Sequence, residues 1–509
     1  MKYKVLSLLL ILPLISACGN NDSGSTDPVE DFYPTLPEYK NKNSGEIKTE
    51  GDEVFFDFYE ISDFHGATEY SKDDHRLGIE RLSKYFDDKR ALNPGGTFVL
   101  SGGDMWQGSA DSNLTRGALV TYAMNVMNFD SMTMGNHEFD WTDKFIKNNK
   151  ERAKFPFLAA NIVKTSDGTL PEYLEASKIV TRGDYKVGII GTIGDSIKNT
   201  ILASAIEGLD FKDEIETVQA ESAKLREAGC DIVVWSSHND VHDLKEKANG
   251  KDLGVNLIFG GHSHTTLVDE VNGIPMLESK DLGRSIPHAQ LKLNKTTKEV
   301  SVVEGYGCDE DPTAKEYEPD ADITGIYTQY KEKFIDPTKH KYVCKADGDL
   351  GTEQLGNLAV ESMFNKIKKD YPDYQVRASF TNLNGGVRAD IKSGKVYYGD
   401  VYVTFPFDNE VVICSVKGKA LKNFINNTSN VARYQDVLKY ENLGDNEDCY
   451  FITTDFLATN AGFFKGKCTI VVYTKVMLRD AASEAMSAMK TVKADSYKTS
   501  AKAEFQKLS

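Results

Sequence analysis

The stretch TMGNHEFD, residues 133–140, places an asparagine, a histidine and two carboxylates directly after an apolar run and a glycine. A turn needs the glycine, because glycine adopts backbone angles that other residues avoid. A turn alone has no use for Asn136, His137, Glu138 and Asp140 side by side. Neighbouring groups of these types are typical of metal binding and of acid–base chemistry.

The same arrangement occurs five times along the chain, always at the end of a predicted strand. Short apolar runs alternate with amphipathic helical segments such as 76–88 and 211–229, which is typical of an α/β architecture. Each run ends in one or two small residues, and Asp, Asn or His follows. Ligands of α/β sheets gather at the carboxyl ends of the strands, so we expect these loops to converge. The predicted strands are 54–61, 97–100, 131–134, 231–235 and 256–259.

The side chains that follow these strands are candidate metal ligands. A single such loop is usually an ordinary turn, but the repetition at successive strand ends favours one metal site. Imidazole nitrogen and carboxylate oxygen suit zinc, manganese and iron. The set exceeds what one tetrahedral ion needs, whereas two ions that share a carboxylate would use all of it. The candidates are Asp63, His65, Asp104, Asn136, His238, His262 and His264.

The N-terminus has the pattern of a bacterial export signal. Lys2 and Lys4 precede an apolar segment at 5–15, which is too short to span a membrane. The ending LISAC resembles a lipobox, which predicts a lipoprotein signal peptide over 1–18 and a lipidated Cys18. An ordinary signal peptidase site is the alternative. The polar stretch behind Cys18 predicts a flexible tether over 19–49, and hence a protein anchored by lipid at the bacterial cell surface or in the periplasm.

The net charge limits the class of molecule that the protein can bind. The net charge of −17 disfavours binding of long nucleic acids, which depends on Lys and Arg contacts to phosphates. Binding of a small phosphate ester remains compatible with this charge, through metals or a few arginines.

The cysteines do not define a disulfide pattern. Cys308 with Cys344 and Cys449 with Cys468 are the couples nearest in the sequence, but the sequence does not choose among the possible disulfides, and buried free thiols are the alternative.

These blocks, in this order, resemble the calcineurin-like metallophosphoesterases, most closely the exported 5'-nucleotidases and the periplasmic UDP-sugar hydrolases. The resemblance extends over residues 54–480. It implies a four-layer αββα metallophosphoesterase sandwich over 50–308, a linker helix over 309–340, and a second α/β domain that binds the substrate over 341–509.

The resemblance also assigns roles to the candidate ligands. Two divalent ions, zinc, manganese or similar, would share Asp104, and they would activate water for attack on phosphorus. His137 resembles the catalytic histidine of the family, with Asp140 holding its orientation. The first ion would take Asp63, His65, Asp104 and His264, and the second would take Asp104, Asn136, His238 and His262.

In the second domain, three segments resemble the substrate-binding segments of the family. They are 382–391, 404–412 and 453–464, and the last two would clamp a base between phenylalanine rings. One departure concerns the ribose, because Gly462 stands where relatives carry an aspartate. The residues that the resemblance assigns to the substrate are Asn384, Gly386, Arg388, Phe407, Asn409 and Phe456.

The expected function is release of phosphate from nucleoside monophosphates, as by a 5'-nucleotidase, for nucleotide scavenging. Within the enzymes, the alternatives are a 2',3'-cyclic-nucleotide phosphodiesterase with 3'-nucleotidase activity and a UDP-sugar hydrolase. From another class, a nucleotide-binding lipoprotein without turnover is the alternative. The presence of both His137 and Asp140 beside a complete ligand set argues against it. The sequence indicates no oligomeric state.

Overall fold

The N-terminal domain is built on two facing sheets. The computed structural model describes residues 29–427, 429–435, 442–460 and 462–508. In the first sheet the strand order is β15-β14-β2-β3-β4-β5, with β1 beside β2 and β16 beside β14, and β2 to β5 are parallel. These strands are β1 Thr49–Glu50, β2 Glu53–Ile61, β3 Thr97–Ser101, β4 Ser131–Thr133, β5 Phe157–Leu158, β14 Ile286–Asn294, β15 Val300–Val302 and β16 Gly307–Asp309.

The second sheet has the order β12-β13-β11-β10-β8-β7, and its four central strands are parallel. The predicted strands are confirmed, with the difference that His238 is the last residue of its strand and does not follow it. The bounds are β7 Ser177–Arg182, β8 Tyr185–Ile193, β10 Ile232–His238, β11 Leu257–Phe259, β12 Leu267–Val271 and β13 Ile274–Glu278.

The two sheets and their covering helices form four layers, which confirms the expected αββα sandwich. Alternate residues of β2 divide between two cores: Phe56 and Phe58 face the second sheet, whereas Tyr59 and Ile61 face the helices. β2 therefore carries buried apolar residues on both sides, as buried parallel strands do. The first sheet is covered by α1 Gly78–Leu92, α3 Ala118–Met127 and α4 Thr142–Arg152, and the second by α5 Glu214–Glu227 and α6 Val241–Ala248.

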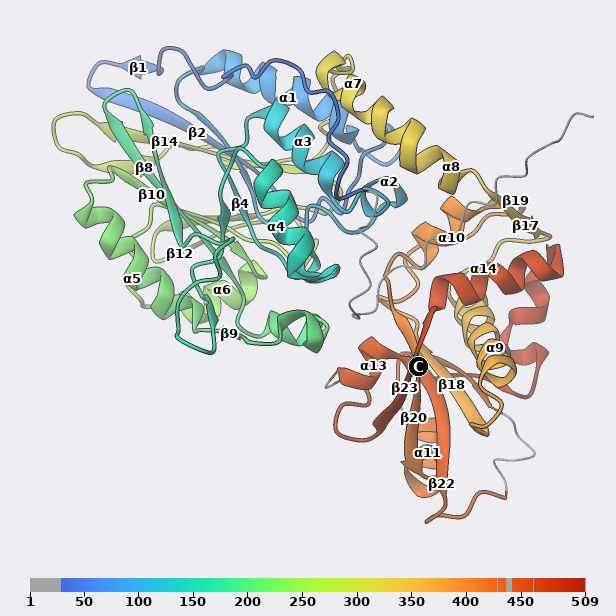
Figure 1. The fold of residues 1–509 in the computed structure, drawn as a ribbon. Coiled ribbons are helices and arrows are strands. Elements are labelled where there is room, and N and C mark those ends of the chain that lie inside the picture. Colours follow the sequence, from blue (N-terminus) through green and yellow to red (C-terminus); the bar gives the residue numbers. More distant parts are fainter. Residues whose placement is uncertain (1–28, 428, 436–441, 461, 509) are drawn as a thin grey trace, which may run out of the picture.

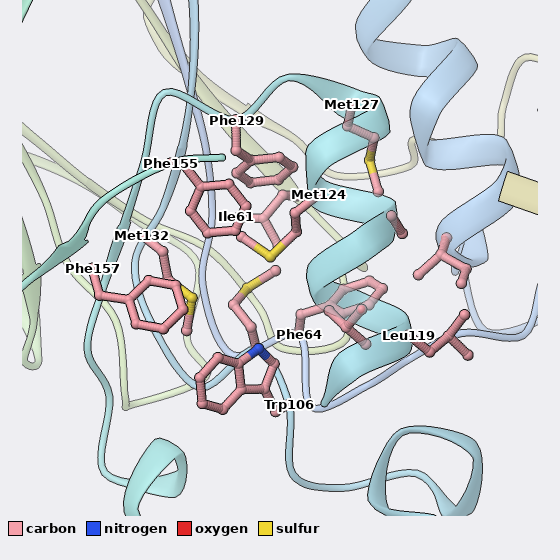
Figure 2. Close-up of a cluster of buried hydrophobic side chains, with 14 of the residues drawn as sticks. Ile61, Phe64, Trp106, Leu119, Met124, Met127, Phe129, Met132, Phe155 and Phe157 are labelled. Carbon is pink, nitrogen blue, oxygen red and sulfur yellow. The ribbon is translucent and has the colours of Figure 1, made fainter. Parts of the chain in front are cut away.

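The core beneath α3 is rich in methionine and aromatic side chains. Figure 2 shows Met124 beside Ile61 and Phe155, with Trp106 below them. The Trp106 ring packs edge-on against Phe157 at 5.5 Å between centroids. Unbranched methionines fill the gaps between rigid rings, so this core supports the strand ends that carry the candidate ligands.

A helical connection leads from the first domain to the second (Figure 1). It comprises α7 Ala321–Tyr330, one π-helical turn at Lys331–Ile335 and α8 Asp336–Lys339. Ile326 and Tyr330 are buried in the core of the first domain, so the connection packs on that domain along its length. At its end, Lys339 pairs with Asp111 at 2.9 Å.

The C-terminal domain has a mixed sheet with helices on both faces. Its six strands have the order β23-β20-β22-β18-β21-β25, and a small sheet β19-β17-β24 lies beside them. Helices α9 Thr352–Asp370 and α14 Leu478–Met489 cover one face, and α11 Gly418–Asn427 and α13 Asp455–Thr459 cover the other. The short α10 covers Tyr398–Thr404. The strands are β17 Tyr342–Ala346, β18 Val376–Asn382, β19 Gly394–Tyr397, β20 Glu410–Lys417, β21 Val431–Gln435, β22 Asp448–Thr454, β23 Thr469–Met477, β24 Thr491–Val492 and β25 Phe505–Leu508.

The flexible tether predicted over 19–49 does not hold for residues 29–49, which pack on the N-terminal domain. The Phe32 ring lies edge-on to Tyr330 and Phe334, at 5.1 and 5.2 Å between centroids. Lys42 pairs with Asp87 at 2.9 Å. The polar composition of the segment favours a flexible tether, and a few apolar residues such as Phe32 are enough to hold it on the domain.

The predicted signal peptide, Cys18 and the start of the tether lie outside the described residues. Among the helices described, none is long and apolar enough to cross a bilayer.

The six cysteines of the described residues have free thiols. Cys308 lies in the N-terminal domain and Cys344 in the C-terminal one. Cys414 on β20 lies against Cys468, and this neighbouring thiol, together with burial, raises the pKa of Cys414. The nearest couples in the sequence are therefore not the nearest in space.

Replacing Phe32 with alanine tests whether residues 29–49 belong to the domain. We expect Phe32→Ala to lower the free energy of unfolding by about 2 kcal/mol, because a half-buried ring leaves its contacts with Tyr330 and Phe334. Thermal unfolding followed by circular dichroism measures the change. Leu92→Ala is the control, since Leu92 is 75% exposed. An unchanged melting temperature for Phe32→Ala would contradict the packing.

Candidate active site

The predicted ligands do converge, at the carboxyl ends of the strands where the two sheets meet. Most of them lie in the left-handed backbone region, which is costly for residues other than glycine. Such conformations persist only where the surroundings enforce them, and they are typical of functional sites. The φ angles are 54° for Asp63, 48° for His65, 52° for Asp104, 74° for His262 and 59° for His264.

One group of acceptors centres on His238. Its Nδ1 lies 2.8 Å from the carbonyl oxygen of Gly102, so Nδ1 carries the hydrogen. The other ring nitrogen, Nε2, then faces two more acceptors, Oδ1 of Asn136 at 3.2 Å and Oδ2 of Asp104 at 3.3 Å. His262 also borders this group, at 5.3 Å between the ring centroids. Nε2 can face these two acceptors only if a proton or a metal ion lies between them, and the imidazole, amide and carboxylate groups are suitable metal ligands.

A second group centres on His65. Its Nδ1 lies 2.8 Å from the carbonyl oxygen of Gln107, which leaves Nε2 as an acceptor. That Nε2 is 3.2 Å from Nε2 of His264, and His264 is 3.3 Å from Oδ1 of Asp63. Asp63 Oδ1 is buried and has no hydrogen-bond partner among the described residues. The orphaned oxygen and the facing nitrogens fit a cation.

Electrostatics favours positive charge at both groups. Burial opposes ionisation of Asp104, but His238 and His137 hold its pKa well below the ordinary value. Burial likewise opposes protonation of His238, yet Asp104 and Asp63 raise the pKa of His238 to about 10. His65 and His262 behave oppositely, because burial lowers their pKa to about 3 and about 4. Neutral imidazoles beside carboxylates are suitable divalent-metal ligands.

His137 and Asp140 form the expected pair. Nδ1 of His137 lies 2.8 Å from Oδ2 of Asp140, and the backbone N–H of His137 donates to Oδ1 of Asp104 at 2.8 Å. Burial disfavours the charged ring, but Asp140 and Asp104 raise the pKa of His137 to about 9. The imidazolium can therefore persist at neutral pH next to the candidate ligands, with Nε2 free to donate.

Glu138 links two of the ligand loops, a role for which the sequence shows no signal. Its Oε2 accepts the backbone N–H groups of Asp104 and Gly135, and its Oε1 accepts that of Met105, each at 2.8 Å. The side chain therefore holds the loop after β3 against the loop after β4. A single buried carboxylate satisfies three backbone donors that would otherwise be unpaired.

The small residues at the strand ends are needed for close approach. A Cβ atom on Gly135 would lie 2.2 Å from Oδ1 of Asp104, and one on Gly261 would lie 2.2 Å from Oγ of Ser62. Neither distance is possible, so the ligand loops can meet only through glycine.

Of the predicted substrate residues, Phe407 and Arg388 are the ones placed next to the catalytic pair. The Phe407 ring stacks on His137, with 5.6 Å between centroids and an angle of 26°. The Arg388 guanidinium lies 5.7 Å from the centre of the Phe407 ring, and its charge lowers the pKa of His65 and His137. The C-terminal domain therefore brings a cation and an aromatic ring to the site.

The other predicted substrate residues lie in the same domain, in more peripheral positions. Asn384 is exposed, and its backbone N–H donates to Oδ1 of Asn430 at 2.9 Å. Gly386 permits a tight turn, because a Cβ there would lie 2.5 Å from the carbonyl oxygen of Asn382. Half-buried Asn409 accepts a backbone bond through its carbonyl oxygen. Phe456 lies on α13 against the apolar cluster of that face, and its ring has no ring contact with Phe407 among the described residues.

Comparison with known proteins agrees with this geometry. Residues 56–266 match the calcineurin-like phosphoesterase family and residues 338–463 match the 5'-nucleotidase C-terminal domain. The chain is 27% identical to the endonuclease YhcR of Bacillus subtilis, over 68% of this chain but 30% of that protein. It is 26% identical to a probable 5'-nucleotidase of Treponema pallidum, over 68% of each chain. A 5'-nucleotidase precursor from Thermus thermophilus shares the fold, with a TM-score of 0.69 and 20% identity over 86% of this chain and 97% of that one.

The fold and the clustered ligands define a metal-dependent phosphoric ester hydrolase. The chain carries a calcineurin-like phosphoesterase domain over residues 56–266, followed by a 5'-nucleotidase C-terminal domain over residues 338–463. Enzymes of this family use divalent metals, and three groups of side chains here lie close enough to hold ions. They are Asp63, His65 and His264; His65, Asp104 and His137; and Asp104, His238 and His262.

Adding one methyl group at Gly135 should weaken metal binding. We expect Gly135→Ala to reduce metal affinity by about tenfold or more, because the new Cβ displaces Oδ1 of Asp104. Metal analysis of dialysed protein measures this. Gly325→Ala is the control, since a Cβ there meets nothing within 4 Å. Equal metal content in both variants would contradict the role of Asp104.

Proposed function

We propose that the protein is an exported dimetal phosphohydrolase that releases phosphate from nucleoside monophosphates, most simply 5'-nucleotides, for nucleotide scavenging. The observation that carries the proposal is the stacking of Phe407 on His137, with Arg388 beside the ring. A domain that holds an aromatic face and a cation directly over a phosphoesterase centre suits a substrate with a base at one end and a phosphate at the other.

Two ions would share Asp104, since its carboxylate lies between the two ligand groups. The first would be held by Asp63, His65, Asp104 and His264, and the second by Asp104, Asn136, His238 and His262. Bound divalent ions, zinc, manganese or similar, would supply Lewis acidity and lower the pKa of a water.

The remaining chemistry belongs to side chains of the chain itself. His137, kept charged by Asp140, would donate to the phosphoryl oxygens and to the leaving group as negative charge develops there. Arg388 would neutralise the phosphate from the other side. Phe407 and Phe456 would bind the base, with Asn409 and Asn384 as polar partners and Gly386 allowing close approach of the backbone.

Export and anchoring belong to the same proposal. The signal pattern before Cys18 supports a lipid-anchored protein at the cell surface or in the periplasm, where extracellular nucleotides are met. The endonuclease relative is more than three times as long as the part that this chain matches, and the net charge of −17 disfavours a polynucleotide substrate here. A small nucleotide is therefore the better substrate.

Phosphate release from four substrates tests the function. The chain from Asp27 onward, with manganese, is given 5'-AMP, 3'-AMP, 2',3'-cyclic AMP and UDP-glucose in parallel. We expect a clear preference for 5'-AMP. Preference for 3'-AMP and the cyclic nucleotide would reassign the substrate, consistent with Gly462 at the position of the ribose-binding aspartate. No phosphate from any of them would point either to a substrate that is not a nucleotide or to a nucleotide-binding lipoprotein.

His137→Ala separates catalysis from metal binding. We expect turnover to fall by about a hundredfold or more while metal content stays the same, because the side chain donates protons and is not needed as a ligand. Initial rates and metal analysis on the same preparation measure both. His242→Ala, at an exposed position of α6, is the matched control. Loss of metal from His137→Ala would make His137 a ligand.

A further inference from the structure

Asp408 lies next to Phe407 and is held between two arginines that come from different domains. Arg116 of the N-terminal domain donates through Nη1 to Oδ2 at 2.7 Å, and Arg479 of the C-terminal domain donates through Nη2 to Oδ1 at 2.6 Å. The side chains of Arg116 and Asp408 are only 14% and 15% exposed. Burial opposes the charge, but the two guanidinium groups hold the pKa of Asp408 far below its ordinary range. An ionised carboxylate therefore joins the two domains.

Arg479 holds the loop from within the C-terminal domain. Its Nη1 donates to the carbonyl oxygens of Phe405 and Pro406 at 3.1 and 3.3 Å, and its guanidinium lies 3.8 Å from the centre of the Tyr402 ring. The side chain is 5% exposed. The backbone leading to Phe407 is thus bound to a side chain that itself has little freedom.

Arg116 holds the loop that carries Asp408 next to the segment that carries His137 and Asp140. Its guanidinium lies 5.5 Å from the centre of the Trp141 ring, and Trp141 directly follows Asp140. A second bond crosses the boundary beside it, from Nδ2 of Asn113 to the carbonyl oxygen of Pro406 at 3.1 Å. Two independent contacts therefore place the loop relative to the catalytic pair.

We propose that Asp408 is a positioning residue of the nucleotidase reaction: paired with Arg116 across the domain boundary, it seats Phe407 against His137. Phe407 would hold the base and His137 acts at the phosphate, so their separation decides where phosphorus stands when the base is bound. Errors of about 1 Å in such placement are costly for rate. The inference rests on the proposed function, because only a substrate that reaches Phe407 depends on this separation.

Kinetics on two substrates tests the proposal with Arg116→Gln and Asp408→Asn. For 5'-AMP we expect kcat/KM to fall by about tenfold or more. For p-nitrophenyl phosphate, which does not need Phe407, we expect a change below about twofold, with metal content unaltered. The combined variant should lose no more than the worse single variant, because both substitutions break one ion pair.

Two further variants distinguish positioning from a general structural effect. Arg377→Gln is the matched control, since Arg377 pairs with Glu447 at 3.3 Å inside the C-terminal domain, and it should keep both activities. Arg116→Lys keeps the positive charge without the planar fork and should recover part of the rate on 5'-AMP. Equal losses on both substrates in Arg116→Gln, or full activity on 5'-AMP in Asp408→Asn, would overturn the proposal.

Solution scattering gives a readout that does not need 5'-AMP. We expect Arg116→Gln to shift the small-angle X-ray scattering curve toward a more open arrangement of the two domains, and Arg377→Gln to leave it unchanged. If the unaltered protein does not hydrolyse 5'-AMP, the proposed function fails and scattering alone decides on the contact. An unchanged curve for Arg116→Gln would then refute the role of the Arg116–Asp408 pair.

Discussion

The active site depends on one electrostatic constraint: buried nitrogen and oxygen atoms that accept hydrogen bonds face one another at close range. The Nδ1 hydrogens of His65 and His238 are donated to backbone carbonyls, so their Nε2 atoms face His264, Asn136 and Asp104, where only an added proton or a cation can lie between the acceptors. Buried lone pairs and carboxylates in this arrangement repel one another unless positive charge lies among them. The divalent metals that enzymes of this family use would supply that charge, and the phosphoesterase activity of the family depends on the same ions.

The surrounding fold keeps the ligands in place although their backbone is strained. The strand ends are held by apolar cores on both faces of each sheet, which fixes where each loop starts. Glu138 then binds three backbone N–H groups from two loops, and Gly135 lets Asp104 approach as closely as it does. Left-handed conformations at Asp63 and Asp104 are tolerated because packing and hydrogen bonds allow no alternative.

The second domain changes what this centre can act on. Metal ligands alone would serve any accessible phosphoester. Phe407, on the loop before β20, and Arg388, on the loop after β18, reach the site only because the C-terminal domain brings these loops there. In the proposed function, selectivity for a nucleotide would therefore depend on the boundary between the two domains, where the buried carboxylate of Asp408 pairs with arginines of both. Surface ion pairs contribute little, but these pairs are largely removed from water.

The sequence by itself determined the α/β architecture, the strand ends and the seven candidate ligands, because these follow from local patterns: apolar runs, then small residues, then Asp, Asn or His. Only the tertiary structure decided which distant side chains meet. No local pattern marks the three backbone partners of Glu138, and Phe32 packs on Tyr330, which is far away in the sequence. Cys468 lies against Cys414, although Cys449 is nearer to it in the sequence. Asp408 and Arg116 are 292 positions apart. Such contacts depend on how complete layers and domains pack, which no short stretch of sequence encodes.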